Sequence, residues 1–283
     1  MDWGRAKTIL IVAFIITNIF LAYNVWEAKY YGHRNERISD DSIREVVEIL
    51  GQRGIQVNTP IPRDIYTDEI LTARYTEIDA AELIKTVYQG KDVFPGAKGD
   101  SIRYSEDGIV LEIKNNREVF YNNLSLRNQP KGNLTEEQAV DIAENYLREN
   151  GLYKPTMTID SVVPNGDGYL LSFLQKYKDK LLEVSVVEME VTSGGVNSMH
   201  MLWLDPVKAE RSRKKISHAV DALIKVAGQK EILKRVPVEI DSIRLVHYFD
   251  WKTAREGEAF PAWRICVDGE AYYVNALSGQ ISK

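Results

Sequence analysis

The chain is poor in the residue types from which metal sites and disulfide frameworks are built. Cys266 is its only cysteine, and its four histidines are His33, His200, His218 and His247. One thiol excludes an intrachain disulfide and a thiolate metal site, and no two histidines stand at the spacing of metal ligands. We therefore expect neither a metal site nor a cofactor.

An excess of positive charge is also absent. The formal net charge is −5 at pH 7, so the chain has no global electrostatic reason to bind nucleic acid. One local run, from Glu210 to Lys215, is basic. We interpret this run as the solvated start of a helix rather than as a ligand-binding patch.

Known catalytic signatures are missing. The chain contains no G-x-S-x-G motif, phosphate loop or dinucleotide fingerprint. Glu188 and Glu190 alternate along a predicted strand and so share one face, as paired acids of a glycoside hydrolase would. A solvated sheet surface explains them more simply. We predict that no residue is catalytic and that the protein is not an enzyme.

Only one long apolar run is present, from Thr8 to Trp26. As a helix its 19 residues span about 28 Å, close to a hydrocarbon core of about 30 Å. Trp3 stands near one end and Tyr30 near the other, which is typical of a segment with two membrane interfaces. No small-residue cleavage site follows the run. We therefore expect a transmembrane anchor rather than a removed signal peptide or a buried core helix.

The anchor prediction divides the first part of the chain. Basic residues stand on both sides of the run, so charge alone predicts its orientation only weakly. We expect residues 1–7 in the cytoplasm, a transmembrane helix at 8–26, a polar linker at 27–37 and a large domain outside the cell.

Polar residues inside the run suggest a function beyond anchoring, because amides in hydrocarbon cost free energy unless they find partners. Helical spacing puts Ala13, Thr17 and Asn24 on one stripe, with Asn18 and Ala22 nearly opposite. We expect these two faces to contact two neighbouring helices. The alternative is that Asn24 merely reaches the interface and Thr17 bonds to its own backbone.

Helical and strand patterns alternate in the rest of the chain and predict an α+β fold with two domains. The first domain is expected at 38–130, with three short strands between 101 and 123 joined by Asp-Gly and Asn-Asn turns. The second is expected at 131–283. Its first helix begins with Thr135 and Gln138 at the spacing of a capping box.

An internal duplication is indicated within the second domain. The sequence AVDIA at 139–143 returns as AVDAL 80 residues later, and IDSV at 159–162 returns as IDSI 81 residues later. Each copy places a helix before an Ile-Asp-Ser strand. We therefore predict two helix-plus-meander units, at about 134–205 and 215–283, with each helix covering one face of an antiparallel sheet.

Aromatic residues gather near the second Ile-Asp-Ser strand. Such a cluster is typical of a protein-binding patch, although a corner of the hydrophobic core would have the same composition. The candidate patch consists of Tyr248, Phe249, Trp251, Phe260 and Trp263.

The two ends of the chain resemble known families. The C-terminal sequence PAWRICVDGEAYYVNALSGQISK resembles the end of PepSY-type modules, with Asn275 where those usually have Asp. The N-terminal sequence MDWGRAKTILIVAFIITNIFLAYN resembles the start of YycI-type proteins. These are accessory proteins of the Wal (Yyc) two-component system of Gram-positive bacteria.

The resemblance implies partners rather than a substrate. YycI-type proteins sit in the cell membrane with their large domain outside, associate with a YycH-type protein and a sensor histidine kinase, and adjust kinase activity that controls cell-wall metabolism. No catalytic residues are known in the family. The sequence leaves open the sign of the regulation and two alternatives: a tethered ligand-binding sensor module, or a cell-wall hydrolase.

Overall fold

The computed structural model describes residues 14, 17, 18, 21, 22, 38–63, 67–128, 132–249 and 255–282. The predicted cytoplasmic segment 1–7 and linker 27–37 lie outside these residues. Within the predicted anchor the five described residues are helical. Among all described residues, no helix has the length and apolar character needed to cross a membrane.

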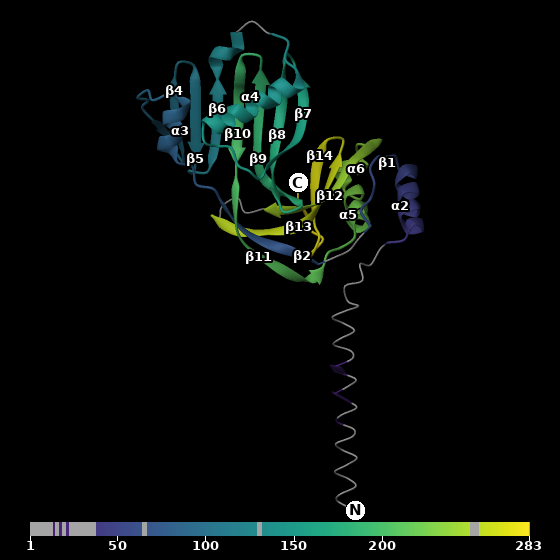
Figure 1. Ribbon diagram of the computed structural model, residues 1–283. Helices are drawn as coiled ribbons and strands as arrows, with labels where there is room; N and C mark the ends of the chain where they lie inside the picture. The colour runs from purple at the N-terminus through teal and green to yellow at the C-terminus, as the bar shows by residue number, and fades with distance from the viewer. Residues whose placement is uncertain are drawn as a thin grey trace, which may run out of the picture.

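Two lobes make up the rest of the described chain (Figure 1). We define the base lobe as residues 38–75 and 204–282, and the inserted lobe as residues 76–203. The elements of the base lobe are α2 (Asp40–Gln52), β1 (Ile55–Val57), β2 (Thr67–Tyr75), β11 (Leu204–Lys215), α5 (Ala219–Ala227), α6 (Lys230–Leu233), β12 (Val238–Phe249), β13 (Glu256–Val267), β14 (Glu270–Asn275) and β15 (Ile281–Ser282).

The inserted lobe lies between β2 and β11, which pair with each other in antiparallel orientation. Its elements are α3 (Ala80–Val87), β3 (Gly96–Lys98), β4 (Ser101–Glu106), β5 (Ile109–Lys114), β6 (Glu118–Asn123), the 3-10 helix η1 (Leu124–Asn128), α4 (Glu136–Glu149), β7 (Met157–Asn165), β8 (Gly168–Tyr177), β9 (Lys180–Thr192) and β10 (Gly195–Leu202). The three strands predicted between 101 and 123 correspond to β4, β5 and β6. The described strands of both lobes form one 15-stranded sheet.

The boundary predicted at residue 130 does not separate two cores. One hydrophobic core includes buried residues from Ile78 to Trp203 and so spans that position. A second core joins Leu50 and Ile55, near the start of the base lobe, to residues from 216 to 276. The physical reason is non-local pairing, because β2 and β11 bring together segments that are separated by the whole inserted lobe.

Both Ile-Asp-Ser segments begin a meander of four antiparallel strands that follows a helix. The first unit is α4 with β7 to β10, and the second is α5 with β12 to β15. Each first strand has a β-bulge at its aspartate, because Asp160 and Asp241 are each an extra residue in the pairing with the next strand. The shared bulge extends the sequence repeat to backbone geometry.

Local signals explain where α4 begins and which face it buries. The Thr135 side chain accepts from the backbone N–H of Gln138, and the Gln138 side chain accepts from the N–H of Thr135. Ala139, Ala143 and Leu147 recur at helical spacing and are fully buried against the sheet. The predicted cap is therefore correct.

The helix α5 is more deeply buried than α4. Its buried residues are Ala219, Val220, Ala222, Leu223, Val226 and Ala227. It packs against β13 and β14 and also against α2. A helix covered on two sides needs apolar residues around most of its circumference. This position explains the near-continuous apolar sequence AVDALIKVA.

Two further details correct or sharpen the sequence interpretation. The basic run from Glu210 to Lys215 belongs to strand β11, not to a helix start, because it pairs with β2.

At the C-terminal turn, the Asn275 side-chain oxygen accepts from the backbone N–H groups of Leu277 (2.8 Å) and Ser278 (3.0 Å). Asparagine thus supplies the acceptor that an aspartate would supply in such a turn.

Candidate functional site

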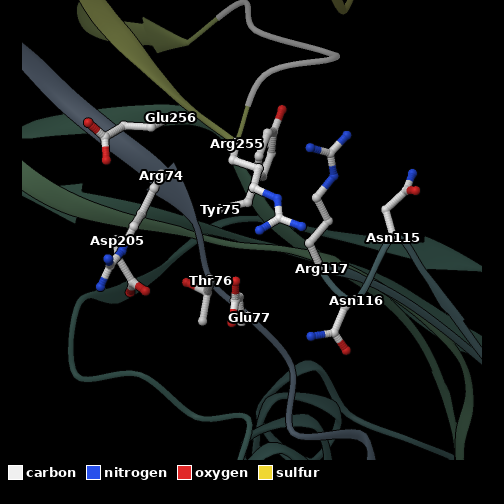
Figure 2. A pocket seen from close by; sticks show the side chains of 10 residues that line it. All are labelled: Arg74, Tyr75, Thr76, Glu77, Asn115, Asn116, Arg117, Asp205, Arg255 and Glu256. Atoms are coloured by element: carbon white, nitrogen blue, oxygen red, sulfur yellow. The ribbon is translucent and has the colours of Figure 1, made fainter.

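A cleft of about 870 Å³ opens where the chain passes between the two lobes. It is drawn in Figure 2. Its lining carries three arginines, three acids and two asparagines besides a tyrosine and a threonine. The residues are Arg74, Tyr75, Thr76, Glu77, Asn115, Asn116, Arg117, Asp205, Arg255 and Glu256.

Backbone hydrogen bonds fix the walls of this cleft. The N–H of Tyr75 donates to the carbonyl oxygen of Arg255 at 3.2 Å, and the N–H of Thr76 donates to that of Trp203 at 2.9 Å. The N–H of Ile78 donates to the carbonyl oxygen of Asn116 at 2.9 Å. The segment that leaves β2 is thereby held to the start of β13, to the end of β10 and to the β5–β6 turn.

The three arginines have different surroundings. Arg74 lies on β2 between two acidic cross-strand neighbours, Asp205 on β11 and Glu256 on β13. The guanidinium carbon of Arg117 lies 4.1 Å from the centroid of the buried Tyr75 ring. That ring makes an edge contact with Phe249, with centroids 5.4 Å apart. Cation–π stacking orients Arg117 towards the cleft.

A seam joins the two lobes beside the cleft. Two residues of β9 pair in parallel with β12, His247 with Leu182 and Tyr248 with Glu183. Between Leu182 and Val186 the pairing of β9 with β8 shifts register. At this irregularity Glu183 does not pair with β8. Its buried carboxylate instead contacts the base lobe.

On one side of the seam, Glu183 lies in a network of charges. Its side chain is 4% exposed and lies 3.6 Å from Nε of Arg264, while the Tyr273 hydroxyl donates to it at 2.9 Å. Arg264 also contacts Asp160 of β7, at 3.5 Å. Burial raises the pKa of Glu183, and the charge of Arg264 opposes that rise. The network ties β7 and β9 to β13 and β14.

On the other side of the seam lies His247, which is 2% exposed. Its Nε2 is 3.1 Å from the carbonyl oxygen of Glu69 and so donates to it. Its Nδ1 is buried and has no hydrogen-bond partner among the described residues. Nearby, the buried Asp68 pairs with Lys180 at 3.3 Å. Burial lowers the pKa of His247, while the charge of Asp68 raises it in part.

Most of the aromatic residues predicted to form a surface patch are buried. Tyr248 is 7% exposed, and Phe249 and Trp263 are each 1% exposed. Phe260 is half-buried, and Trp251 lies outside the described residues. The Trp263 indole donates to the Ser217 carbonyl oxygen at 2.9 Å, which anchors it in the core. The core alternative therefore applies to the three buried residues, and the patch hypothesis is wrong for them.

Of the predicted anchor contacts, Ala13 and Asn24 lie outside the described residues. Thr17, Asn18 and Ala22 are helical and exposed. The side-chain amide of Asn18 donates to the carbonyl oxygen of Phe14 at 2.9 Å. Part of its polarity is thus satisfied within its own helix.

Sequence reasoning missed the cleft because its arginines come from three distant segments. The one local signal was the Asn115–Asn116 turn directly before Arg117. Both asparagines adopt positive φ, 51° and 56°, as expected for a tight hairpin turn. Within the parts of the chain that the structure describes, no group of His, Cys, Asp and Glu residues is arranged to hold a metal ion.

Comparison with solved structures finds similar folds at low sequence identity. An uncharacterized protein from Eubacterium rectale is 12% identical, with a TM-score of 0.52, and the match covers 81% of this chain and 90% of that one. YycH from Bacillus subtilis is 13% identical, with a TM-score of 0.51, over 76% of this chain and 56% of that one. The YpeB C-terminal domain of Bacillus megaterium is 13% identical, with a TM-score of 0.41, over 74% of this chain and 97% of that domain.

At the level of sequence, no match was found among curated proteins. The family model of the YycI protein, however, matches residues 34–277. That range includes the inserted lobe, the seam and all of the base lobe except its last residues, 278–282. The chain belongs to the YycI family, the accessory regulators of the Wal (Yyc) two-component system.

Proposed function

We propose that this protein is a membrane-anchored, non-enzymatic regulator that associates with a YycH-type protein and with the sensor histidine kinase of the Wal system. In this proposal it adjusts kinase activity and thereby the control of cell-wall metabolism. The observation that carries the proposal is the family match over residues 34–277. The fold similarity to YycH, at a TM-score of 0.51, supports it.

The predicted anchor at 8–26 is the proposed route to the kinase. The bond from Asn18 to Phe14 uses one of the two N–H groups of the amide. The other N–H and the carbonyl oxygen remain for a neighbouring helix. We propose one contact face with Asn18 and Ala22 and a second with Ala13, Thr17 and Asn24, one for each of two partner helices.

The test is co-purification after crosslinking in membranes that also contain the YycH-type protein and the kinase. We expect the full chain to capture both partners. Replacing residues 8–26 by an unrelated transmembrane helix should weaken capture of the kinase. Undiminished capture of both partners would show that the exterior domain alone makes the contacts, and capture of neither by the full chain would contradict the proposal.

A double substitution, Asn18→Leu with Ala22→Leu, tests the first contact face. It preserves an apolar helix of the same length, so membrane insertion should be unchanged. We expect weaker co-purification of one partner and unaltered co-purification of the other. The matched control is Leu21→Ile, which leaves the polar residues of the anchor in place and should change neither partner. Equal capture in all variants would contradict the two-face hypothesis.

A second candidate function is a tethered sensor module that binds an extracytoplasmic ligand. The observation that favours it is the charged cleft at the junction of the lobes, since ligand sites are often concave and lie between structural units. This candidate is compatible with the first, because a ligand held between lobes could bias the contacts that a regulator makes.

A further inference from the structure

We propose that Asn165 is a site of spontaneous deamidation, at which its side-chain amide is converted into a carboxylate. Asn165 ends β7 and is followed by Gly166 and Asp167, the two turn residues before β8. Among the described strands β7 pairs only with β8, so it is an edge strand of the inserted lobe (Figure 1). Asparagine followed by glycine is the dipeptide most prone to this reaction, because glycine has no Cβ to hinder attack by its own backbone nitrogen.

The reaction needs only water. A base in the solvent removes the proton of the Gly166 backbone N–H, and the nitrogen forms a bond with Cγ of Asn165. The bond from Cγ to Nδ2 then breaks, and Nδ2 leaves as ammonia with a proton taken from water. Addition of water to either carbonyl of the resulting succinimide ring opens it to aspartate or isoaspartate. The amide is thus hydrolysed without an oxidant or a reductant.

The same dipeptide occurs a second time, at Asn150 and Gly151, in opposite surroundings. Asn150 is 9% exposed, and its side-chain amide donates to the carbonyl oxygen of Tyr146 at 2.9 Å. The Gly151 N–H donates to the carbonyl oxygen of Arg148 at 3.1 Å, so the attacking nitrogen is occupied as well. Reaction at this second site therefore requires the end of α4 to open.

Both reacting groups are accessible at Asn165. Asn165 and Gly166 are exposed, and among the described residues the Gly166 N–H makes no backbone hydrogen bond. One N–H of the Asn165 amide donates to Oε1 of Glu190 at 3.1 Å, which holds the side chain in part. That bond lies at the surface, so it slows the reaction less than a buried bond would.

Deamidation here breaks a bridge between three strands. The Glu190 carboxylate of β9 accepts from Asn165 of β7 through Oε1, and from Asn197 of β10 at 2.6 Å through Oε2. Conversion of Asn165 to aspartate replaces the donor amide by a second carboxylate. Two like charges this close repel each other, so the β7–β8 hairpin should open more readily.

The experiment follows the modification in the full chain in detergent. The protein is incubated in heavy-oxygen water and then digested in ordinary water, so that mass spectrometry marks the carboxylates formed in the folded protein. We expect Asn165 to be labelled at least about tenfold faster than Asn150, the ratio expected when one buried hydrogen bond must break first. The rate should rise with pH, because the attacking nitrogen must lose a proton. In urea the two sites should react at similar rates.

Variants separate the contributions. Glu190→Ala releases the amide and should speed the labelling of Asn165 by about twofold to tenfold. Asn165→Gln lengthens the side chain by one methylene and disfavours ring closure, so labelling at this position should be lost. The label at Asn150 should be the same in both variants. Thermal unfolding of each variant shows whether the fold is intact.

Two further variants test the consequence of the reaction. Asn165→Asp reproduces the product, and Asn165→Ala removes the amide without adding a charge. Hydrogen exchange in the β7–β8 hairpin should be faster in Asn165→Asp than in Asn165→Ala. Equal exchange in these two variants would overturn the predicted repulsion by Glu190.

The labelling of the unaltered chain decides whether the site exists. Labelling of Asn150 as fast as that of Asn165 in the folded protein would overturn the proposal. So would an unlabelled Asn165 in the folded protein after a time in which both sites react in urea. The assay contains no kinase, so its failure leaves the proposed regulation of the kinase untouched.

Discussion

The two helix–meander units, α4 with β7–β10 and α5 with β12–β15, share a bulge at the same aspartate but use it differently. The Asp160 carboxylate leaves its own unit and lies 3.5 Å from both Arg244 and Arg264 of the base lobe. The Asp241 carboxylate stays in its own unit, where it accepts from the Gly269 N–H at 2.9 Å. A repeated backbone feature thus fixes where an aspartate stands, but not which partner it finds.

The two aspartates also differ in how far their side chains are buried. The side chains of Asp160 and Arg264 are 15% and 16% exposed, because the other lobe covers them. Asp241 is exposed beside its own hairpin. The first copy therefore contributes its aspartate to the cohesion of the lobes, whereas the second contributes to a local turn.

The largest effect is expected at Arg264, the cation of the seam. Arg264→Ala leaves the buried carboxylate of Glu183 without its nearest positive charge. Breaking one partner of a buried ion pair costs about 3–5 kcal/mol, so the free energy of unfolding should fall by that amount. Urea unfolding of the full chain, followed by circular dichroism, measures it. Arg264→Lys is the matched control and should lose less; a loss below about 1 kcal/mol for Arg264→Ala would contradict the account.

The repeated aspartates give a direct test of the comparison. Asp160→Asn removes a charge that faces two arginines in a half-buried seam and should cost about 1–2 kcal/mol. Asp241→Asn keeps an oxygen that can accept from Gly269 and should cost about 0.5 kcal/mol or less. The same unfolding measurement compares the two variants. Equal losses would mean that the seam pair contributes no more than the hairpin contact.

Local parts of the fold could be predicted from sequence, and non-local ones could not. The cap of α4 depends on Thr135 and Gln138, three residues apart, and was correctly predicted. The insertion of a whole lobe between β2 and β11 depends on pairing between residues 67–75 and 204–215, which no local pattern records. The cleft could not be predicted for the same reason, because its arginines come together only through non-local pairing.

The prediction of an aromatic surface patch was wrong for a different reason. Val246, His247, Tyr248 and Phe249 are all buried, because the end of β12 lies inside the sheet and is covered on both faces. A strand covered on both faces shows no alternation of apolar and polar residues. Composition alone therefore could not distinguish a surface patch from a core.

The histidine of the seam predicts a dependence of stability on pH. Burial lowers the pKa of His247 in the folded protein, while the unfolded chain has a value of about 6.5. Below that pH the unfolded state binds more protons, so stability is full above about pH 6.5 and falls as the pH is lowered towards the folded pKa. The slope for one group is at most about 1.4 kcal/mol per pH unit.

His247→Gln isolates this contribution, since glutamine keeps an N–H donor for the Glu69 carbonyl but does not titrate. The comparison is made by urea unfolding between pH 5 and 7.5. Asp68, Glu69 and Lys180, whose charges act on His247, are retained in both proteins. We expect the wild-type chain to lose stability relative to the variant as the pH falls. Parallel pH profiles would show that His247 is as easily protonated in the folded state as in the unfolded chain.

An effect smaller than that of Arg264→Ala, and confined to one helix, is expected where the two units begin. In α4 the first turn precedes the repeated Ala-Val-Asp segment and is capped by Thr135. In α5 the repeated segment itself begins the helix at Ala219, because β11 extends to Lys215 and leaves no room for that turn. Thr135→Ala should therefore cost about 1 kcal/mol, the usual value for a lost N-cap. Thr135→Ser keeps the acceptor oxygen and should be nearly neutral.

The predicted loss for Thr135→Ala is local to α4, so it should add to that of Asp160→Asn in the double variant. A clear departure from additivity would mean that the start of α4 and the seam are coupled.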